Sequence, residues 1–178
     1  MFKLYDDVLF KYSLPNHLEI KDHILNNLID GNTVIDPNTK DEISRSDYDI
    51  KYEKVAPYFD TLEKSLIKYF HPIIHKQFNC KEFCLDRFWY QQYTNNNKHS
   101  WHYHGECNMI AVYFLELPDD NFKTQFKDMF RNKVIEYEAE EGDIVLTNSL
   151  VMHQSPTLLS NKRKTSISLN YNIRAVNE

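Results

Sequence analysis

Glycine is scarce in this chain, which has three glycines in 178 residues. The sequence contains neither GxGxxG nor GxxxxGK(S/T), which excludes the glycine-rich loops that cradle dinucleotides and nucleotide phosphates. The GxSxG elbow of α/β-hydrolases is also absent. No apolar run approaches the roughly 18 residues of a membrane span, and acidic residues occur early, at Asp6 and Asp7. We therefore expect neither a membrane span nor a secretion signal.

Cysteine and clustered basic residues are scarce as well. The three cysteines cannot all pair, and a chain of this size needs no disulfide, which favours a reducing cytoplasm. The richness in Asn, Lys, Ile, Tyr and Phe is typical of AT-rich coding, so we expect a bacterial or virus-infected host cell. The net charge is −5 without a dense Lys/Arg cluster, so we expect no nucleic-acid partner.

The composition, 42% apolar and 26% charged, is that of one globular domain over residues 1–178. Residues 1–82 predict a mainly helical support, with helices expected near 15–31 and 54–78. Residues 83–178 change to a period near two, which is typical of strands. The expected strands are 84–94, 108–117, 133–138, 143–148 and 164–172. Helices followed by several short strands predict an α+β chain, with a sandwich or barrel buttressed by the helices.

Two pairs of histidines have a spacing that suits metal binding. His71 and His75 are four residues apart on an expected helix, but Pro72 lies between them and no third helical ligand is near, so we expect a polar surface there. His102 and His104 are two residues apart near a strand end, where alternate residues share a face. This segment alone leaves two interpretations open, a chelating pair or a polar, exposed strand end.

A third histidine strengthens the metal-binding interpretation. His153 follows a turn, an apolar strand and a short polar stretch, all within residues 141–153. A close pair of histidines and a distant one on a later strand match three ligands at one rim of a β-barrel. Three nitrogen or oxygen ligands with open positions suit non-haem Fe(II) chemistry.

The expected strand 164–172 has one apolar and one polar face. Ile167 and Leu169 share the face that suits packing under helices. Lys164 begins the other face, two residues before Ser166. A cation near a hydroxyl at the start of an inward polar face is a suitable carboxylate anchor. An amphipathic surface strand is the alternative.

Four stretches follow one another along residues 85–174. They are Gln92-Tyr93 with His99 to His104, Val112 to Leu115, Glu141 to His153, and Arg163 to Asn170. In order and spacing they resemble the Fe(II)/2-oxoglutarate-dependent oxygenases, in particular the prolyl-hydroxylase-like branch often found in bacteria and phages. The resemblance implies an α+β fold with a double-stranded β-helix (jelly-roll, cupin-like) core over residues 83–178, buttressed by N-terminal helices.

The resemblance also implies roles for single residues. His102 would be the first iron ligand and His153 the distal one. The basic residue ten or eleven places after His153, Arg163 or Lys164, would bind the far carboxylate of 2-oxoglutarate. Strand alternation favours Lys164, whereas arginine is commoner in this role. Tyr93 lies where the family often has a tyrosine that binds the cosubstrate.

The second ligand departs from the family pattern, in which Asp or Glu stands two places after the first histidine. This position is His104 here, which gives His-x-His, and we favour His104 as the second ligand. The other register, His104-Gly105-Glu106, restores His-x-Glu and would make Glu106 the ligand. Three neutral imidazoles leave the site one negative charge poorer, which should weaken Fe(II) retention.

The resemblance implies an enzyme, a 2-oxoglutarate-dependent dioxygenase that hydroxylates an unidentified protein residue or small molecule and releases succinate and CO2. It would use Fe(II), 2-oxoglutarate as cosubstrate and O2. Two alternatives remain open: a cupin-like metalloenzyme that does not use 2-oxoglutarate, and a non-catalytic jelly-roll binding module. The sequence indicates neither the prime substrate nor the oligomeric state.

Overall fold

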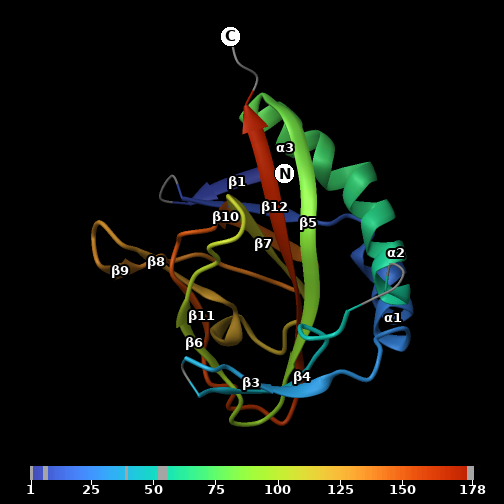
Figure 1. Ribbon diagram of the computed structural model, residues 1–178, viewed down its shortest axis with the longest axis vertical. Coiled ribbons are helices and arrows are strands. Elements are labelled where there is room, and N and C mark those ends of the chain that lie inside the picture. Colours follow the sequence, from blue (N-terminus) through green and yellow to red (C-terminus); the bar gives the residue numbers. More distant parts are fainter. Residues whose placement is uncertain (1, 6–7, 39, 52–55, 176–178) are drawn as a thin grey trace.

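The computed structural model describes residues 2–5, 8–38, 40–51 and 56–175, and its strands form antiparallel sheets flanked by helices (Figure 1). The strands are β1 (Phe2–Tyr5), β2 (Leu9–Ser13), β3 (Asn32–Ile35), β4 (Glu42–Ser46), β5 (Cys80–Tyr93), β6 (His99–His102), β7 (Met109–Glu116), β8 (Gln125–Asp128), β9 (Lys133–Val134), β10 (Asp143–Asn148), β11 (His153–Ser155) and β12 (Lys164–Ala175). The helical segments are α1 (His17–Asn26), α2 (Pro57–Ser65), the π-helical turn η1 (Leu66–Phe70), α3 (His71–Phe78) and the 3₁₀ turn η2 (Asp120–Phe122).

The larger sheet has eight strands in the order β1-β2-β10-β7-β12-β5-β4-β3, and the smaller has four in the order β6-β11-β8-β9. The longest ladder joins β5 and β12, from the pair Lys164 and Tyr93 to the pair Ala175 and Cys80. This ladder runs along most of the long axis of the molecule (Figure 1). One of its faces is covered by α1, α2 and α3, and the other faces the smaller sheet.

Alternation along β12 divides the interior into two chemically different layers. Ile167, Leu169 and Tyr171 lie in an apolar core together with buried residues of α1, α2 and α3. Ser166 and Ser168 are also buried, but they point to the opposite face because successive side chains of a strand alternate. The predicted packing of this strand under the helices is confirmed. Its polar face lies between the two sheets, where a binding site can form.

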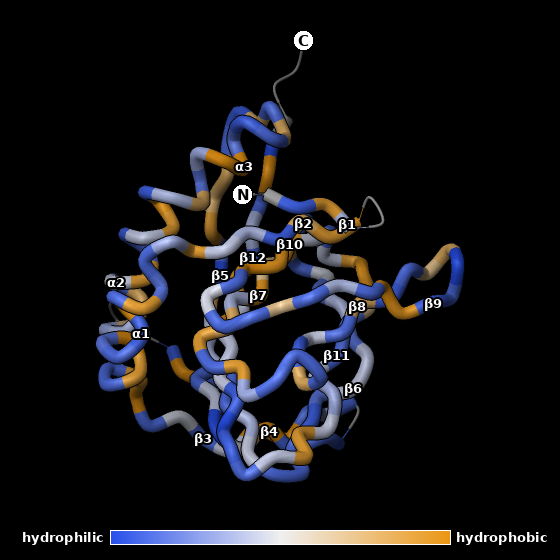
Figure 2. Tube along the Cα trace, turned by 180° about the vertical axis from the view of Figure 1, so that it is seen from behind, coloured by the Kyte–Doolittle hydropathy of each residue, from blue (hydrophilic) through white to orange (hydrophobic). Residues whose placement is uncertain are grey.

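The helix expected over residues 54–78 is divided rather than continuous. Between α2 and α3 the backbone widens into the π-helical turn η1, directly before Pro72 in the first turn of α3. Proline lacks the N–H that would continue the α-helical hydrogen bonds, so a change of helix geometry at this point is expected. Figure 2 shows hydrophobic and hydrophilic segments alternating along the helical segments, as in amphipathic helices. Within the described ranges, no helix is long and apolar enough to cross a membrane.

The expectation of a mainly helical first half is wrong in part, because four strands lie before residue 50. β2 pairs with β10 and so extends the larger sheet, and β3 and β4 form a hairpin in the polar segment 32–50. Each of these strands has only four or five residues. Such strands show too few alternations to be distinguished from loops by period, and their pairing partners are distant in the sequence.

Most strands expected in the second half are confirmed with small changes at their ends. The exception is the strand expected over 133–138, of which only Lys133–Val134 pairs, with β8. The short strands β6, β8 and β11 are not among these expected ranges, although the histidine spacing indicated strands near His102 and His153. They matter most for function, since together with β9 they make up the smaller sheet.

Candidate metal centre

Three histidines from distant parts of the chain meet between the sheets. His102 ends β6 and His153 begins β11, and the two residues are direct cross-strand partners. His104 follows β6, where its backbone N–H donates to the carbonyl of Ser149 at 2.9 Å. The ring centroids of His102 and His153 are 4.2 Å apart, and those of His104 and His153 are 5.0 Å apart. One ring nitrogen of each histidine lies within 4.8 Å of the others.

Hydrogen bonds hold each ring by its Nδ1 atom. Nδ1 of His102 donates to the carbonyl of Ser100 at 2.7 Å, and Nδ1 of His153 donates to the carbonyl of Val151 at 3.0 Å. Nδ1 of His104 donates to Oδ1 of Asn170 at 2.8 Å. Since the Nδ1 atoms carry the protons, the lone pairs lie on the Nε2 atoms, which are free to bind a metal.

Burial keeps the three imidazoles neutral. Desolvation, with the neighbouring His99 and His104, lowers the pKa of His102 to about 3. Desolvation and the two other rings hold the pKa of His153 well below its ordinary value, and burial also lowers the pKa of His104. A metal binds only the neutral form of imidazole, so the centre is prepared for a cation at neutral pH.

Glu106, the alternative second ligand, lies outside this cluster. Its side chain is 80% exposed, and its nearest ion-pair partner is Nη1 of Arg87 at 4.0 Å. Among the described residues, the group that brings three potential ligand atoms together contains His104 and not Glu106.

A fourth histidine, His99, packs against His102. The rings of His99 and His102 are stacked, with centroids 3.8 Å apart and 19° between their planes. Nε2 of His99 lies 3.1 Å from Oδ2 of Asp36, just beyond the end of β3. The hairpin of β3 and β4 is therefore connected to His102 through a buried histidine. The sequence analysis missed this contact, because nothing near His99 in the sequence indicates a partner 63 residues earlier.

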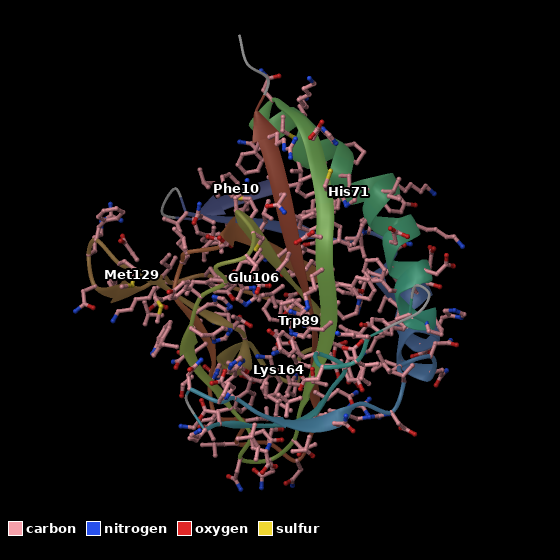
Figure 3. The ribbon with its side chains drawn as sticks, viewed as in Figure 1. Phe10, His71, Trp89, Glu106, Met129 and Lys164 are labelled. Atoms are coloured by element: carbon pink, nitrogen blue, oxygen red, sulfur yellow. The ribbon has the colours of Figure 1, made fainter. Side chains whose placement is uncertain are left out.

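Lys164 lies in the interior between the two sheets (Figure 3). The residue is 1% exposed, and its Nζ donates to Oγ of Ser155 at 2.7 Å. Nζ also lies 5.1 Å from the centroid of the Tyr93 ring. Burial lowers the pKa of this amine from 10.5 to about 7. No carboxylate of the residues described here lies within ion-pair distance of Nζ, so the site offers a buried cation without an anion.

Arg163 points the other way and forms a two-pronged ion pair with Glu116, with both N–O distances at 2.8 Å. Tyr93 and Ser166 are both buried on the face that carries Lys164. Burial raises the pKa of Tyr93, so its hydroxyl stays protonated. The two basic candidates are thus separated: Arg163 lies outside in an ion pair, and Lys164 lies inside with no acidic partner in the part of the chain that the structure describes.

A cavity of about 310 Å³ opens beside the histidines. Its wall consists of the β3–β4 hairpin, the inward face of β5, and the segment that carries the histidines. The lining residues are Val34, Asp36, Pro37, Asn38, Ile43, Ser46, Tyr48, Arg87, Trp89, Gln91, His99, His102, Tyr103, His104, Gly105, Glu106 and Asn170. Ligand sites of this kind combine apolar walls with a few polar groups.

The other histidine pair, His71 and His75, is not a second centre of the same kind. Nε2 of His71 lies 3.2 Å from the hydroxyl of Tyr171, and Nδ1 of His75 lies 3.4 Å from Sγ of Cys80. Burial, with His75 nearby, lowers the pKa of His71 to about 4. Each ring has a protein partner of its own.

No protein-family model matches the chain, and no curated protein matches it. Solved structures do. An oxidoreductase of the 2OG-Fe(II) oxygenase family from Burkholderia pseudomallei superimposes with a TM-score of 0.72 at 14% identity, over 94% of this chain and 86% of that one. The chain has the 2OG-Fe(II) oxygenase fold. The resemblance that the sequence indicated is thereby confirmed at the level of the fold.

Two further structures show how widely this 2OG-Fe(II) oxygenase fold is used. A viral collagen prolyl hydroxylase from Paramecium Bursaria Chlorella virus-1, solved with 2OG, has a TM-score of 0.60 at 11% identity, over 96% of this chain and 97% of that one. The epimerase SnoN from nogalamycin biosynthesis, described as α-ketoglutarate dependent, has a TM-score of 0.62 at 10% identity, over 92% and 76%. The shared architecture therefore does not define a single substrate.

Proposed function

We propose that this protein is an Fe(II)- and 2-oxoglutarate-dependent oxygenase, a single domain over residues 1–178 whose two sheets form a double-stranded β-helix. The observation that carries the proposal is the combination of three neutral imidazoles around one point with a buried ionisable amine, Lys164, that has no carboxylate within ion-pair distance among the described residues. A metal and a dicarboxylate would satisfy both features.

The three histidines fit a divalent iron ion. His102, His104 and His153 would hold it by Nε2, because each Nδ1 already donates a hydrogen bond. Three nitrogen ligands leave coordination positions open for the cosubstrate and oxygen, as non-haem iron oxygenases require. We assign the second ligand to His104 rather than Glu106, since only His104 belongs to the cluster.

The interior cation fits the far carboxylate of 2-oxoglutarate. Lys164 would bind it as a charge-assisted partner, with the hydroxyls of Ser155, Ser166 and Tyr93 nearby. Ser155 stands two residues after His153 on β11, so the two lie on one strand face about 7 Å apart. That span suits a five-carbon dicarboxylate with one end at the metal and the other at Lys164.

With iron, 2-oxoglutarate and O2 bound, the site would supply the oxidising chemistry of hydroxylation, with release of succinate and CO2. The chain's own part is positioning and shielding. The hydrogen bonds at Nδ1 orient the ligands, and the apolar residues beneath the site, Phe126 among them, exclude water from its closed side. The cavity beside His102 and His104 leaves the other side open to a substrate.

The prime substrate is a protein residue or a small molecule, and we place the reaction in the cytoplasm of a bacterium or a virus-infected cell. The viral neighbour named as a collagen prolyl hydroxylase favours a peptide, whereas the epimerase from nogalamycin biosynthesis favours a small molecule. Cavity size is compatible with either a side chain or a compact molecule.

The test is succinate formation from 2-oxoglutarate by purified protein reconstituted with Fe(II) and ascorbate, beside His153→Ala. We expect slow turnover without prime substrate that disappears in the variant. A thermal-shift measurement with Mn(II) and N-oxalylglycine, a 2-oxoglutarate mimic, runs in parallel. Stabilisation by the metal but not by the mimic would indicate the three-histidine metalloenzyme that does not use 2-oxoglutarate. Indifference to both would indicate a non-catalytic module.

A further inference from the structure

The inward faces of β5 and β12 form a polar ladder with a cation near each end. The cross-strand pairs on this face are Lys164 with Tyr93, Ser166 with Gln91, Ser168 with Trp89, and Asn170 with Arg87. Lys164 and Asn170 are six residues apart, or roughly 20 Å along an extended strand. Figure 3 shows Lys164 and Trp89 one after the other, with the exposed Glu106 beyond Trp89. Lys164 marks the inner end of the ladder and Arg87 marks its opposite end.

Arg87 is held in a fixed position beside the metal centre. Its guanidinium carbon lies 4.1 Å from the centroid of the Tyr48 ring, and one Nη donates to the Tyr48 carbonyl at 2.8 Å. It pairs across the strands with Asn170, the residue that orients His104. Its carboxylate partner in the described chain, the exposed Glu106, is 4.0 Å away and makes no hydrogen bond to it. A planar cation held in this way still has N–H groups free for an anion.

A second donor lies two residues further along the same face. Trp89 is 5% exposed and lines the cavity, yet its indole N–H has no acceptor within the described residues. A buried donor without a partner costs about 1–3 kcal/mol, so such groups in native proteins call for an explanation. The guanidinium carbon of Arg87 is 5.5 Å from the centroid of the Trp89 ring. The indole nitrogen itself is inaccessible in the ligand-free wall, so Trp89 offers its N–H only when the wall adjusts to a ligand, whereas Arg87 already lines the cavity.

The wall near these donors is mixed, since polar residues such as Glu106 and Asn170 line it together with aromatic ones. Tyr48, Tyr103 and Pro37 line the cavity on the side of Arg87 and the hairpin. This side favours a substrate with a compact apolar or ring-shaped body. The donors then select for an oxygen-rich group at one end of that body.

We infer that Arg87 and Trp89 form the binding site for an anionic group of the prime substrate, a carboxylate or a phosphate, at the opposite end of the ladder from the 2-oxoglutarate anchor Lys164. The inference rests on the proposed function, because it takes the metal centre as the point of reaction. Glu106 is displaced from Arg87 when the substrate anion binds. The enzyme therefore acts on an anionic substrate whose reacting carbon lies within the cavity, beside His102 and His104.

The test uses matched pairs of probes that differ in charge. Phenylacetate is compared with phenylacetamide, and phenyl phosphate with benzyl alcohol, by calorimetric titration into protein saturated with Mn(II) and N-oxalylglycine. We expect at least one anion to bind about tenfold more tightly than its neutral counterpart, as befits charged hydrogen bonds. The stronger of the two anions identifies the substrate group as carboxylate or phosphate.

Three variants separate the contributions. Arg87→Met should abolish the preference for the anion, Arg87→Lys should retain part of it, and Trp89→Phe, which keeps an aromatic ring but removes the N–H, should reduce it a few-fold. The matched control is Arg174→Met, which removes an arginine from the outer end of β12 where it pairs with Glu82. That variant should bind like the wild type.

Equal binding of the anionic and neutral probes, or an unchanged preference in Arg87→Met, would overturn the inference. The titration is repeated on Lys164→Met with Mn(II) alone, so that the other buried cation contributes nothing. If the anion preference persists in that variant while the wild-type protein fails to turn over 2-oxoglutarate, the proposed function is refuted and the anion site remains supported. Normal 2-oxoglutarate turnover without any anion preference would support the proposed function and refute the anion site.

Discussion

The ammonium of Lys164 donates to the hydroxyl of Ser155 at 2.7 Å, two residues beyond His153 on the same strand. This contact connects the candidate anion anchor to the candidate metal centre through three residues of β11. A hydroxyl is a weak partner for a fully buried cation, since it brings no opposite charge. Burying Lys164 without an opposite charge costs free energy of folding, and a bound carboxylate would remove that cost.

Lys164 and Arg163 provide a direct comparison of adjacent cations. Lys164→Met should weaken N-oxalylglycine binding to the Mn(II)-loaded protein on the order of 100-fold, because the buried charged partner is lost. Arg163→Met should change it by less than about threefold, because Arg163 is engaged with Glu116 outside the site. Calorimetry measures both. The opposite ranking would assign the carboxylate to Arg163.

The same lysine should make stability depend on pH. Its pKa is about 7 in the folded protein and near 10.5 when unfolded, so between these values the unfolded chain binds more protons. The free energy of unfolding should therefore rise from pH 7 to pH 9 by about 2 kcal/mol through this group. Urea unfolding of the ligand-free wild type and of Lys164→Met at each pH measures this effect as the difference between their free energies of unfolding. Parallel pH profiles of the two proteins would contradict the low pKa.

Alternation along single strands made much of this site predictable from the sequence. The residues of β12 show it best: polar residues at 164, 166 and 168 and apolar ones at 167 and 169 assigned both faces correctly. The spacing of two residues between His102 and His104 likewise predicted that both side chains lie at one site. Patterns of this kind are local, and a regular strand preserves them.

Long-range contacts explain what the sequence did not reveal. The partner of His99 is Asp36, on a hairpin whose strands are too short to show a period. The same hairpin forms part of the cavity wall, so the shape of the cavity could not be predicted from the sequence either. The indole N–H of Trp89 lacks an acceptor among the described residues only because of how the wall is assembled, and no sequence pattern predicts it.

The choice of the second ligand is testable with neighbouring variants. His104→Ala should lower the affinity for Mn(II) by about 100-fold or more, since the nitrogen proposed to bind the metal is lost together with its ring's hydrogen bond to Asn170. Glu106→Ala should leave Mn(II) affinity within about threefold of wild type, because this carboxylate is exposed. Metal titration followed by electron paramagnetic resonance measures both. Loss of metal binding in Glu106→Ala alone would restore the His-x-Glu register.

Asn170 should influence the metal without touching it. Its Oδ1 accepts the Nδ1 proton of His104 at 2.8 Å, which fixes the ring orientation. Asn170→Ala should therefore reduce metal affinity about tenfold, within the range found for groups that orient metal ligands. Ser168→Ala, two residues away on the same face, is the control and should bind Mn(II) normally. Equal affinity in the two variants would show that Asn170 has no orienting role.

Gly31 should limit the stability of the hairpin that walls the cavity. Its N–H donates to the hydroxyl of Tyr90 at 2.9 Å, and a Cβ added here would collide with that hydroxyl and with the carbonyl of Ser46. Because that carbonyl belongs to the backbone of β4, the hairpin must shift, and Gly31→Ala should cost about 1–3 kcal/mol.

Thermal unfolding measures this cost as a fall of about 3–10 °C in Tm. Gly105→Ala is the control, because nothing lies within 4 Å of a Cβ added at Gly105. Its Tm should match that of the wild type. Since Ser46 and Asp36 of this hairpin region line the cavity, Gly31→Ala should also weaken binding of any ligand seated there. An unchanged Tm in Gly31→Ala would mean that the hairpin yields without strain.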